Sequence, residues 1–150
     1  MYWLLSIAVL IGVLATAEDI WRRQISNTIT VGAFALGLVA QTALYGLKGL
    51  GSALGGTVAG FLVFLIFFLL GGMGGGDIKL MAGFGAVIGL SRIVPAAVMT
   101  AIAGALFALG YLLVRKIRGK SKDTDKAAEP EAIPYAPAIS LGVLLSFAAG

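Results

Sequence analysis

Apolar residues dominate this chain in long runs, and the runs end at isolated charged residues. Five stretches contain no Asp, Glu, Lys or Arg: 1–17, 24–47, 49–76, 93–114 and 132–150. A sixth and shorter stretch covers 80–91. A helix needs ~20 apolar residues to cross a bilayer. The pattern therefore predicts an all-α polytopic membrane protein, a single domain over 1–150 with six transmembrane helices at about 2–18, 27–47, 50–71, 78–91, 93–114 and 133–149.

The composition agrees with this prediction. The chain is 59% hydrophobic and 12% charged, whereas soluble domains are ~45–50% apolar and ~25% charged. The first run, 1–17, contains no early Lys or Arg. Because a secretory signal peptide opens with a basic region, we interpret this run as a membrane helix that is retained.

The basic residues predict how the helices are oriented. The second and fourth loops contain only Lys48 and Arg92, one each, and the other nine basic residues fall on the opposite side. Since cytoplasmic loops collect Lys and Arg, the richer side should be cytoplasmic, with both termini outside the cytoplasm. Residues 115–131 mix charges of both signs and are expected to form a polar cytoplasmic loop. Topology and anionic lipid account for the basic residues, so we expect a membrane partner and no nucleic acid.

The residue types that the chain lacks narrow its chemistry. It contains neither His nor Cys, which excludes Cys/His zinc sites and His-based catalytic triads. We expect no metal and no cofactor. Acid–base chemistry would have to use carboxylates, of which the chain has seven. Four lie in the polar loop, which leaves Glu18, Asp19 and Asp77 as candidates.

A glycine-rich break precedes Asp77. Residues 71–77 read GGMGGGD, and glycine both disfavours helix and permits close approach of another backbone. The predicted topology places Asp19 and Asp77 on the same membrane face at similar depth. Two neighbouring carboxylates share one proton, so one can activate water while the other protonates the leaving group. This pairing favours aspartyl peptide hydrolysis.

A simpler interpretation of the same residues stays open. Each Asp could be a solvated residue at the membrane interface, where a carboxylate costs less than at the bilayer centre. Arg22 and Arg23 lie close enough along the helix to pair with Asp19, and Lys79 could screen Asp77.

Three short blocks resemble the type IV prepilin peptidase family of G-x-G-D membrane aspartyl proteases. Gly74-Gly75-Gly76-Asp77 reads G-x-G-D. The stretch from Asp19 to Asn27 is similar to the family's first-aspartate block, although Ser26 stands where Pro is usual. The stretch from Ile133 to Ala138 resembles the start of the family's last helix.

The resemblance implies an inner-membrane endopeptidase of a prokaryote that removes the basic leader from prepilins or pseudopilins at the cytoplasmic face. Larger bacterial members carry a zinc-binding cysteine region and methylate the new N-terminus, so this chain is expected to resemble the compact, peptidase-only form that serves tight-adherence pili. An archaeal relative acting on preflagellin is the other form considered. The residues implied at the site are the catalytic pair Asp19 and Asp77, the loop residues Gly74, Gly75 and Gly76, and the supporting residues Lys79, Asn27, Pro134 and Tyr135.

Three questions remain open from the sequence. Glu18 is the neighbour that competes with Asp19, and the spacing to Ile25 and Asn27 favours Asp19 within the resemblance. A small carrier could use Asp19 and Asp77 as a proton or cation relay, because acids inside membranes often serve that role. A non-catalytic assembly protein of a membrane complex is the third interpretation.

Overall fold

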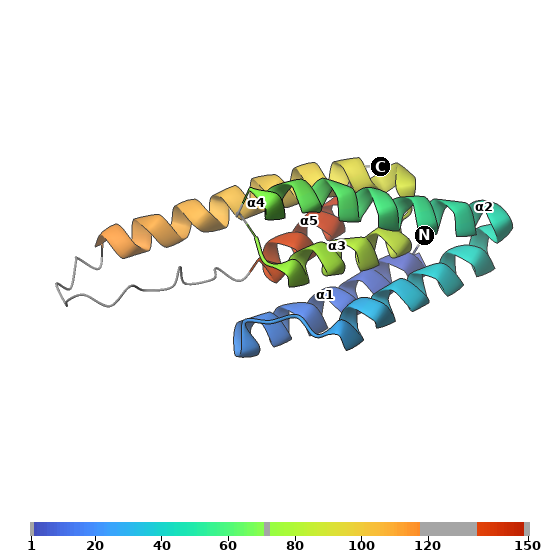
Figure 1. The fold of residues 1–150 in the computed structure, drawn as a ribbon, viewed down its shortest axis with the longest axis horizontal. Helices are drawn as coiled ribbons and strands as arrows, with labels where there is room; N and C mark the ends of the chain where they lie inside the picture. Colours follow the sequence, from blue (N-terminus) through green and yellow to red (C-terminus); the bar gives the residue numbers. More distant parts are fainter. Residues whose placement is uncertain (1, 71–72, 118–134, 149–150) are drawn as a thin grey trace.

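The structure is a computed structural model that describes residues 2–70, 73–117 and 135–148. It is a bundle of helices with no strand in these ranges (Figure 1). The helices are α1 (Tyr2–Arg22), α2 (Asn27–Leu69), α3 (Gly75–Ile88), α4 (Leu90–Ile117) and α5 (Ala136–Ala148). The prediction of an all-α fold is confirmed.

Helix α2 combines two of the predicted helices. Gly46 interrupts it with a left-handed backbone, φ 61° and ψ −142°, a conformation that glycine adopts without steric cost. The two arms of α2 run in opposite directions from this point (Figure 1). The predicted break around 48–49 is therefore placed slightly late, because Gly46 and not Lys48 makes the turn.

The membrane prediction is confirmed in its coarse form. Three helices are long and apolar enough to cross a bilayer: α1, α2 and the part of α4 from Leu90 to Gly110. With 14 and 13 residues, α3 and α5 are shorter than the roughly 17–25 residues that a spanning helix needs. The six crossings and the side of the termini stay predictions.

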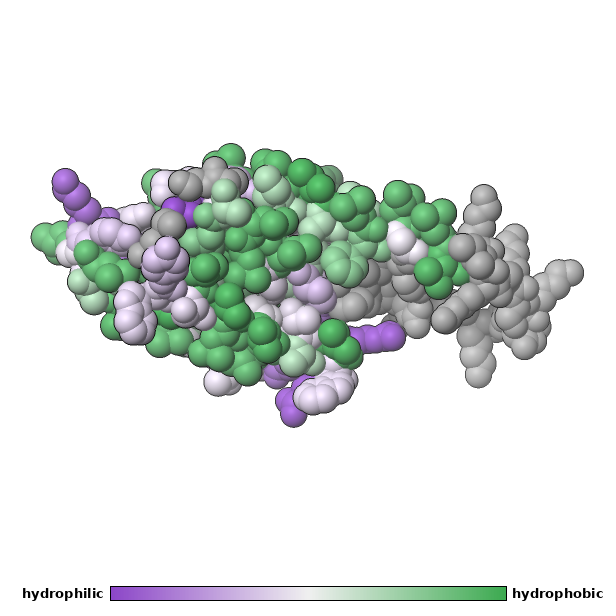
Figure 2. Space-filling view, turned by 180° about the vertical axis from the view of Figure 1, so that it is seen from behind, coloured by the Kyte–Doolittle hydropathy of each residue, from purple (hydrophilic) through white to green (hydrophobic). Residues whose placement is uncertain are grey.

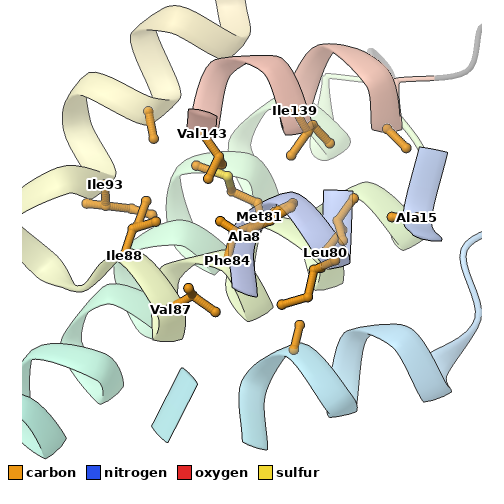
Figure 3. Close-up of a cluster of buried hydrophobic side chains, with 14 of the residues drawn as sticks. Ala8, Ala15, Leu80, Met81, Phe84, Val87, Ile88, Ile93, Ile139 and Val143 are labelled. Carbon is orange, nitrogen blue, oxygen red and sulfur yellow. The ribbon is translucent and has the colours of Figure 1, made fainter. Parts of the chain in front are cut away.

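Helix α3 lies at the centre of the bundle. From Ile78 to Ile88, only Lys79 and Ala82 escape full burial. Figure 3 shows Met81 and Phe84 among side chains from α1 and α5, such as Ala8 and Val143. The outer helices instead expose large apolar side chains, including Leu14, Val39 and Ile102, and Figure 2 shows apolar surface over much of the body. This distribution suits a lipid surrounding.

Small residues let α3 approach both arms of α2 closely. A Cβ on Gly85 would collide with the carbonyl oxygen of Gly56 on one arm, and a Cβ on Gly83 would lie 3.0 Å from the carbonyl oxygen of Thr30 on the other. Backbones therefore approach closely at these glycines. Gly51 takes no part in this packing, because its Cβ would have nothing within 4 Å.

Two predicted boundaries need correction around the polar segments. Helix α3 begins at Gly75, so Gly75, Gly76 and Asp77 form a helical first turn and not an irregular loop. Helix α4 continues to Ile117, so residues 115–117 of the predicted loop 115–131 are helical. The remainder of that loop, 118–131, lies outside the described residues.

Candidate active site

Asp19 lies near the C-terminal end of α1 and is 6% exposed. Its Oδ2 atom accepts a hydrogen bond of 3.0 Å from the backbone N–H of Ala136, the first residue of α5. The first N–H groups of a helix have no partner within the helix, and they favour a negative charge nearby. Asp19 therefore caps α5, and α5 in turn orients the carboxylate.

Asp77 occupies the first turn of α3 and is 7% exposed. Its Oδ2 atom accepts a 3.1 Å hydrogen bond from the backbone N–H of Gly74, the extended residue that caps the helix. An acid at this position is favourable because it faces the positive end of the helix dipole. The G-x-G-D block thus begins α3, and the backbone N–H of its first glycine binds the carboxylate of its aspartate.

The two aspartates line one cavity of about 340 Å³. They are close enough for the charge of Asp19 to act on Asp77. The cavity forms where the end of α1 meets the starts of α3 and α5. Its other lining residues are Arg23, Gln24, Ile25, Gly74, Gly75, Gly76 and Tyr135. We call this space the acid cavity.

The structure brings together only some of the residues that the sequence singled out. The three glycines and Tyr135 line the acid cavity with the aspartates. Lys79 and Asn27 do not; their side chains bond each other, with Lys79 Nζ 3.0 Å from Asn27 Oδ1. Pro134 lies outside the described residues.

Glu18 takes a different position from its neighbour. Its Oε2 accepts a 2.8 Å hydrogen bond from the backbone N–H of Ser26, and its Oε1 lies 3.7 Å from Nη1 of Arg22. Arg22 therefore pairs with Glu18, not with Asp19. Ser26 also caps α2, where its hydroxyl accepts from the N–H of Ile29. A proline at 26 would have no N–H to donate to Glu18.

Sequence reasoning missed Gln24 and Ile25 as lining residues, and it treated Arg23 as a membrane anchor and a candidate ion-pair partner of Asp19. The sequence could have indicated these three residues, because all of them lie within the Asp19–Asn27 block that resembles the family. Gly76 explains how this segment reaches the cavity, because a Cβ there would lie 3.3 Å from the Cβ of Ile25. Within the described ranges, no three Asp or Glu side chains gather as a metal site would require.

Comparison with known proteins agrees with the sequence resemblance. A profile of the type IV leader peptidase family matches residues 4–109. A prepilin leader peptidase/N-methyltransferase of Legionella pneumophila is 31% identical over 152 aligned positions, which cover 97% of this chain and 49% of that protein. A protein of the same name from Bacillus subtilis is 34% identical over 97 residues, 63% of this chain and 35% of that protein.

This chain thus spans about half, or less, of the length of these curated relatives. No solved structure matches it. The family profile covers more than two thirds of the chain, including both aspartates and the glycine-rich block. The chain therefore belongs to the type IV leader peptidase family.

Proposed function

We propose that this chain is a membrane aspartyl endopeptidase that removes the basic leader from prepilins or pseudopilins. The observation that carries the proposal is that Asp19 and Asp77, 58 positions apart in the sequence, line one acid cavity. The relatives bear the name prepilin leader peptidase, and an acid pair is the chemistry that such a peptidase needs when no His or Cys is present.

The two carboxylates divide the work of hydrolysis in this proposal. One removes a proton from the attacking water, and the other donates a proton to the departing amine. Two acids held close together share a single proton, which supplies both roles at once. Backbone N–H groups of Ala136 and Gly74 hold one oxygen of each carboxylate. This holds the pair in a defined orientation before substrate arrives.

The wall of the acid cavity suits an extended peptide. Gly74, Gly75 and Gly76 present backbone without side chains, so a substrate backbone can come close to Asp77. Basic residues are more numerous near this end of the bundle, which supports a cavity that faces the cytoplasm, where the basic leader of a prepilin would be reached.

The proposal is tested by co-expressing a prepilin with wild type, Asp19→Asn or Asp77→Asn at matched membrane levels, and reading leader removal as a gel shift. Asn keeps the acceptor oxygen for the N–H of Ala136 or Gly74, so the fold should be retained. We expect each variant to lose about 10²–10⁴-fold in cleavage rate. Normal cleavage by both variants would sink the aspartyl mechanism.

The relay hypothesis predicts a different result. A carrier that uses Asp19 and Asp77 would leave the prepilin uncut in wild type and would move protons or cations in proteoliposomes, with flux lost in both Asn variants. An assembly protein would show neither cleavage nor flux. Measuring cleavage and flux with the same three proteins separates the interpretations.

A further inference from the structure

A groove of about 280 Å³ lies on the outer surface of the bundle. Both arms of α2 line it, through residues such as Val31 and Phe61, and α3 contributes Lys79, Ala82 and Gly83. In the described part of the chain, the residues that line this groove are all different from those that line the acid cavity. We call it the outer groove. It is therefore a separate feature, with no part in the proposed chemistry.

The outer groove is the place where the buried helix α3 reaches the surface. From Ile78 to Ile88, Lys79 and Ala82 are the residues that are not fully buried, and both line the groove. Lys79 follows Asp77 by two residues, or about 200° round the helix, so the two side chains leave α3 on nearly opposite sides. The arms of α2 flank α3 (Figure 1) and form the two walls.

The greater part of the groove is apolar. Phe34 and Phe61 line its walls, and Gly83 presents backbone without a side chain. Thr30 and Thr57 also line it, but their hydroxyls donate to carbonyl oxygens of their own helix at 3.1 and 2.9 Å, so they require no polar ligand. A cavity of roughly 150 Å³ with apolar walls holds benzene. A groove of about 280 Å³ therefore accommodates a stretch of hydrocarbon chain.

One part of the outer groove carries a positive charge. Lys79 and Asn27 are exposed there, and their side chains bond each other at 3.0 Å. No acidic side chain of the described residues forms an ion pair with Lys79. An ammonium group has three donors and a carboxamide has two, so this pair retains N–H groups for an anion. Asn27 is also the first residue of α2, where the helix dipole favours negative charge.

We propose that the outer groove binds an anionic phospholipid of the surrounding bilayer, with its phosphate on Lys79 and Asn27 and part of an acyl chain along Phe34 and Phe61. The rims carry exposed apolar side chains, such as Val31 at 63%, which suit contact with lipid. A net negative headgroup is favoured because the ammonium of Lys79 repels the cationic group of a zwitterionic lipid. One basic residue near anionic lipid changes binding by about fivefold.

The test measures lipid contact by quenching of tryptophan fluorescence with brominated lipids. The chain has two tryptophans, and Trp3→Phe and Trp21→Phe remove them. A single probe is then introduced in the groove by Val31→Trp or away from it by Leu36→Trp. Both positions are exposed on the same arm of α2, and Leu36 does not line the groove. The purified proteins are reconstituted in phosphatidylcholine that contains brominated phosphatidylglycerol or brominated phosphatidylcholine in increasing proportion.

The proposal predicts a lipid preference at one probe and not at the other. In the Val31→Trp protein, phosphatidylglycerol should bind about fivefold more tightly than phosphatidylcholine, whereas the Leu36→Trp protein should show almost no preference. Adding Lys79→Gln should remove the preference at position 31, because Gln is polar but uncharged. Lys48→Gln is the matched control, since it removes an exposed cation beside the turn at Gly46, and it should leave the preference unchanged.

A second variant tests the apolar part of the groove. Ala82→Phe fills it from the half-buried position 82 while Lys79 is retained, and it should also reduce the preference, with helix content by circular dichroism unchanged. A preference that survives Lys79→Gln, or that is equal at positions 31 and 36, would overturn the proposal. A preference that Lys79→Gln abolishes and a folded Ala82→Phe protein retains would overturn the acyl-chain site. Cleavage enters none of these measurements, so they stand apart from the peptidase proposal.

Discussion

Glu18 and Asp19 are neighbours in the sequence, yet they belong to two different regions of the molecule. Glu18 binds groups on the same short stretch of chain, the N–H of Ser26 and the side chain of Arg22. Asp19 binds the N–H of Ala136 from the far end of the chain and lines the acid cavity with Asp77. One carboxylate thus stabilises a local turn, and the other meets groups that only the tertiary fold assembles.

The difference between Glu18 and Asp19 bears on the predicted ion pair between Arg22 and Asp19, which the structure does not contain. Arg22 lies four residues after Glu18 and three after Asp19, so helix spacing allows both pairings, and the structure shows the pair with Glu18. Asp19 projects about 100° away from Glu18, towards the bundle. The difference in role therefore follows from a rotation of one residue along the helix.

The largest expected effect separates the two acids by activity. Glu18→Gln should retain cleavage within about threefold, whereas Asp19→Asn should lose about 10²–10⁴-fold, because general acid–base catalysis contributes that much. The measurement is the initial rate of prepilin cleavage in isolated membranes. Equal losses in the two variants would show that Glu18 and Asp19 do not differ in role.

A smaller effect is expected where the two regions touch. Gly76→Ala places a Cβ 3.3 Å from that of Ile25 and should shift the 23–25 wall of the acid cavity. We expect KM to rise about tenfold with a smaller change in kcat, since an enclosed apolar contact is worth about that much. Gly51→Ala is the matched control, because Gly51 lies outside the acid cavity and its Cβ would have nothing within 4 Å. A KM increase shared by both variants would count against this explanation.

Ser26→Ala should affect stability and spare activity. The hydroxyl caps α2 through the N–H of Ile29, and loss of such a cap costs about 0.5–2 kcal/mol. The backbone bond from Ser26 to Glu18 survives the change. Thermal unfolding in detergent should show a lower Tm at an unchanged cleavage rate. A variant with normal Tm but impaired cleavage would place Ser26 with the acid cavity instead.

Arg22→Ala should have the smallest effect. Its ion pair with Glu18 is 3.7 Å long and its side chain is 76% exposed, and exposed pairs contribute about 0–1 kcal/mol. Neither Tm nor the kinetic constants should change measurably. If KM rises while kcat is unchanged, Arg22 contacts the substrate, and the Glu18 region takes part in recognition.

The sequence was most informative where long runs of one kind of residue set the structure. Uncharged runs predicted helices because the membrane requires every backbone group to be bonded within the segment. They did not predict the turn at Gly46, since a left-handed glycine leaves no hydropathy signal. Nor did they predict that Gly75 and Gly76 are helical, because the favourable start at Asp77 and burial outweigh glycine's low helix propensity.

The candidate site was partly accessible by the same reasoning. Because the chain has no His or Cys, carboxylates were the candidates for acid–base chemistry, and only Glu18, Asp19 and Asp77 lie outside the polar loop. The predicted topology then placed Asp19 and Asp77 on the same membrane face. Local sequence carries no information on the bond between Asp19 and Ala136, which joins residues 117 positions apart. A second cavity, which small residues of α4 line together with Phe64 and Tyr135, was missed for a similar reason. The small-residue face becomes a hollow only when those two rings stand opposite it.

The bond from Ala136 to Asp19 also has a consequence for the chain while it is being synthesised. Asp19 leaves the ribosome early, but the N–H that orients it arrives 117 residues later. Helices α1 to α4 can be in place while the carboxylate still lacks this partner. A nascent chain therefore lacks the N–H that orients Asp19 until α5 docks against the end of α1.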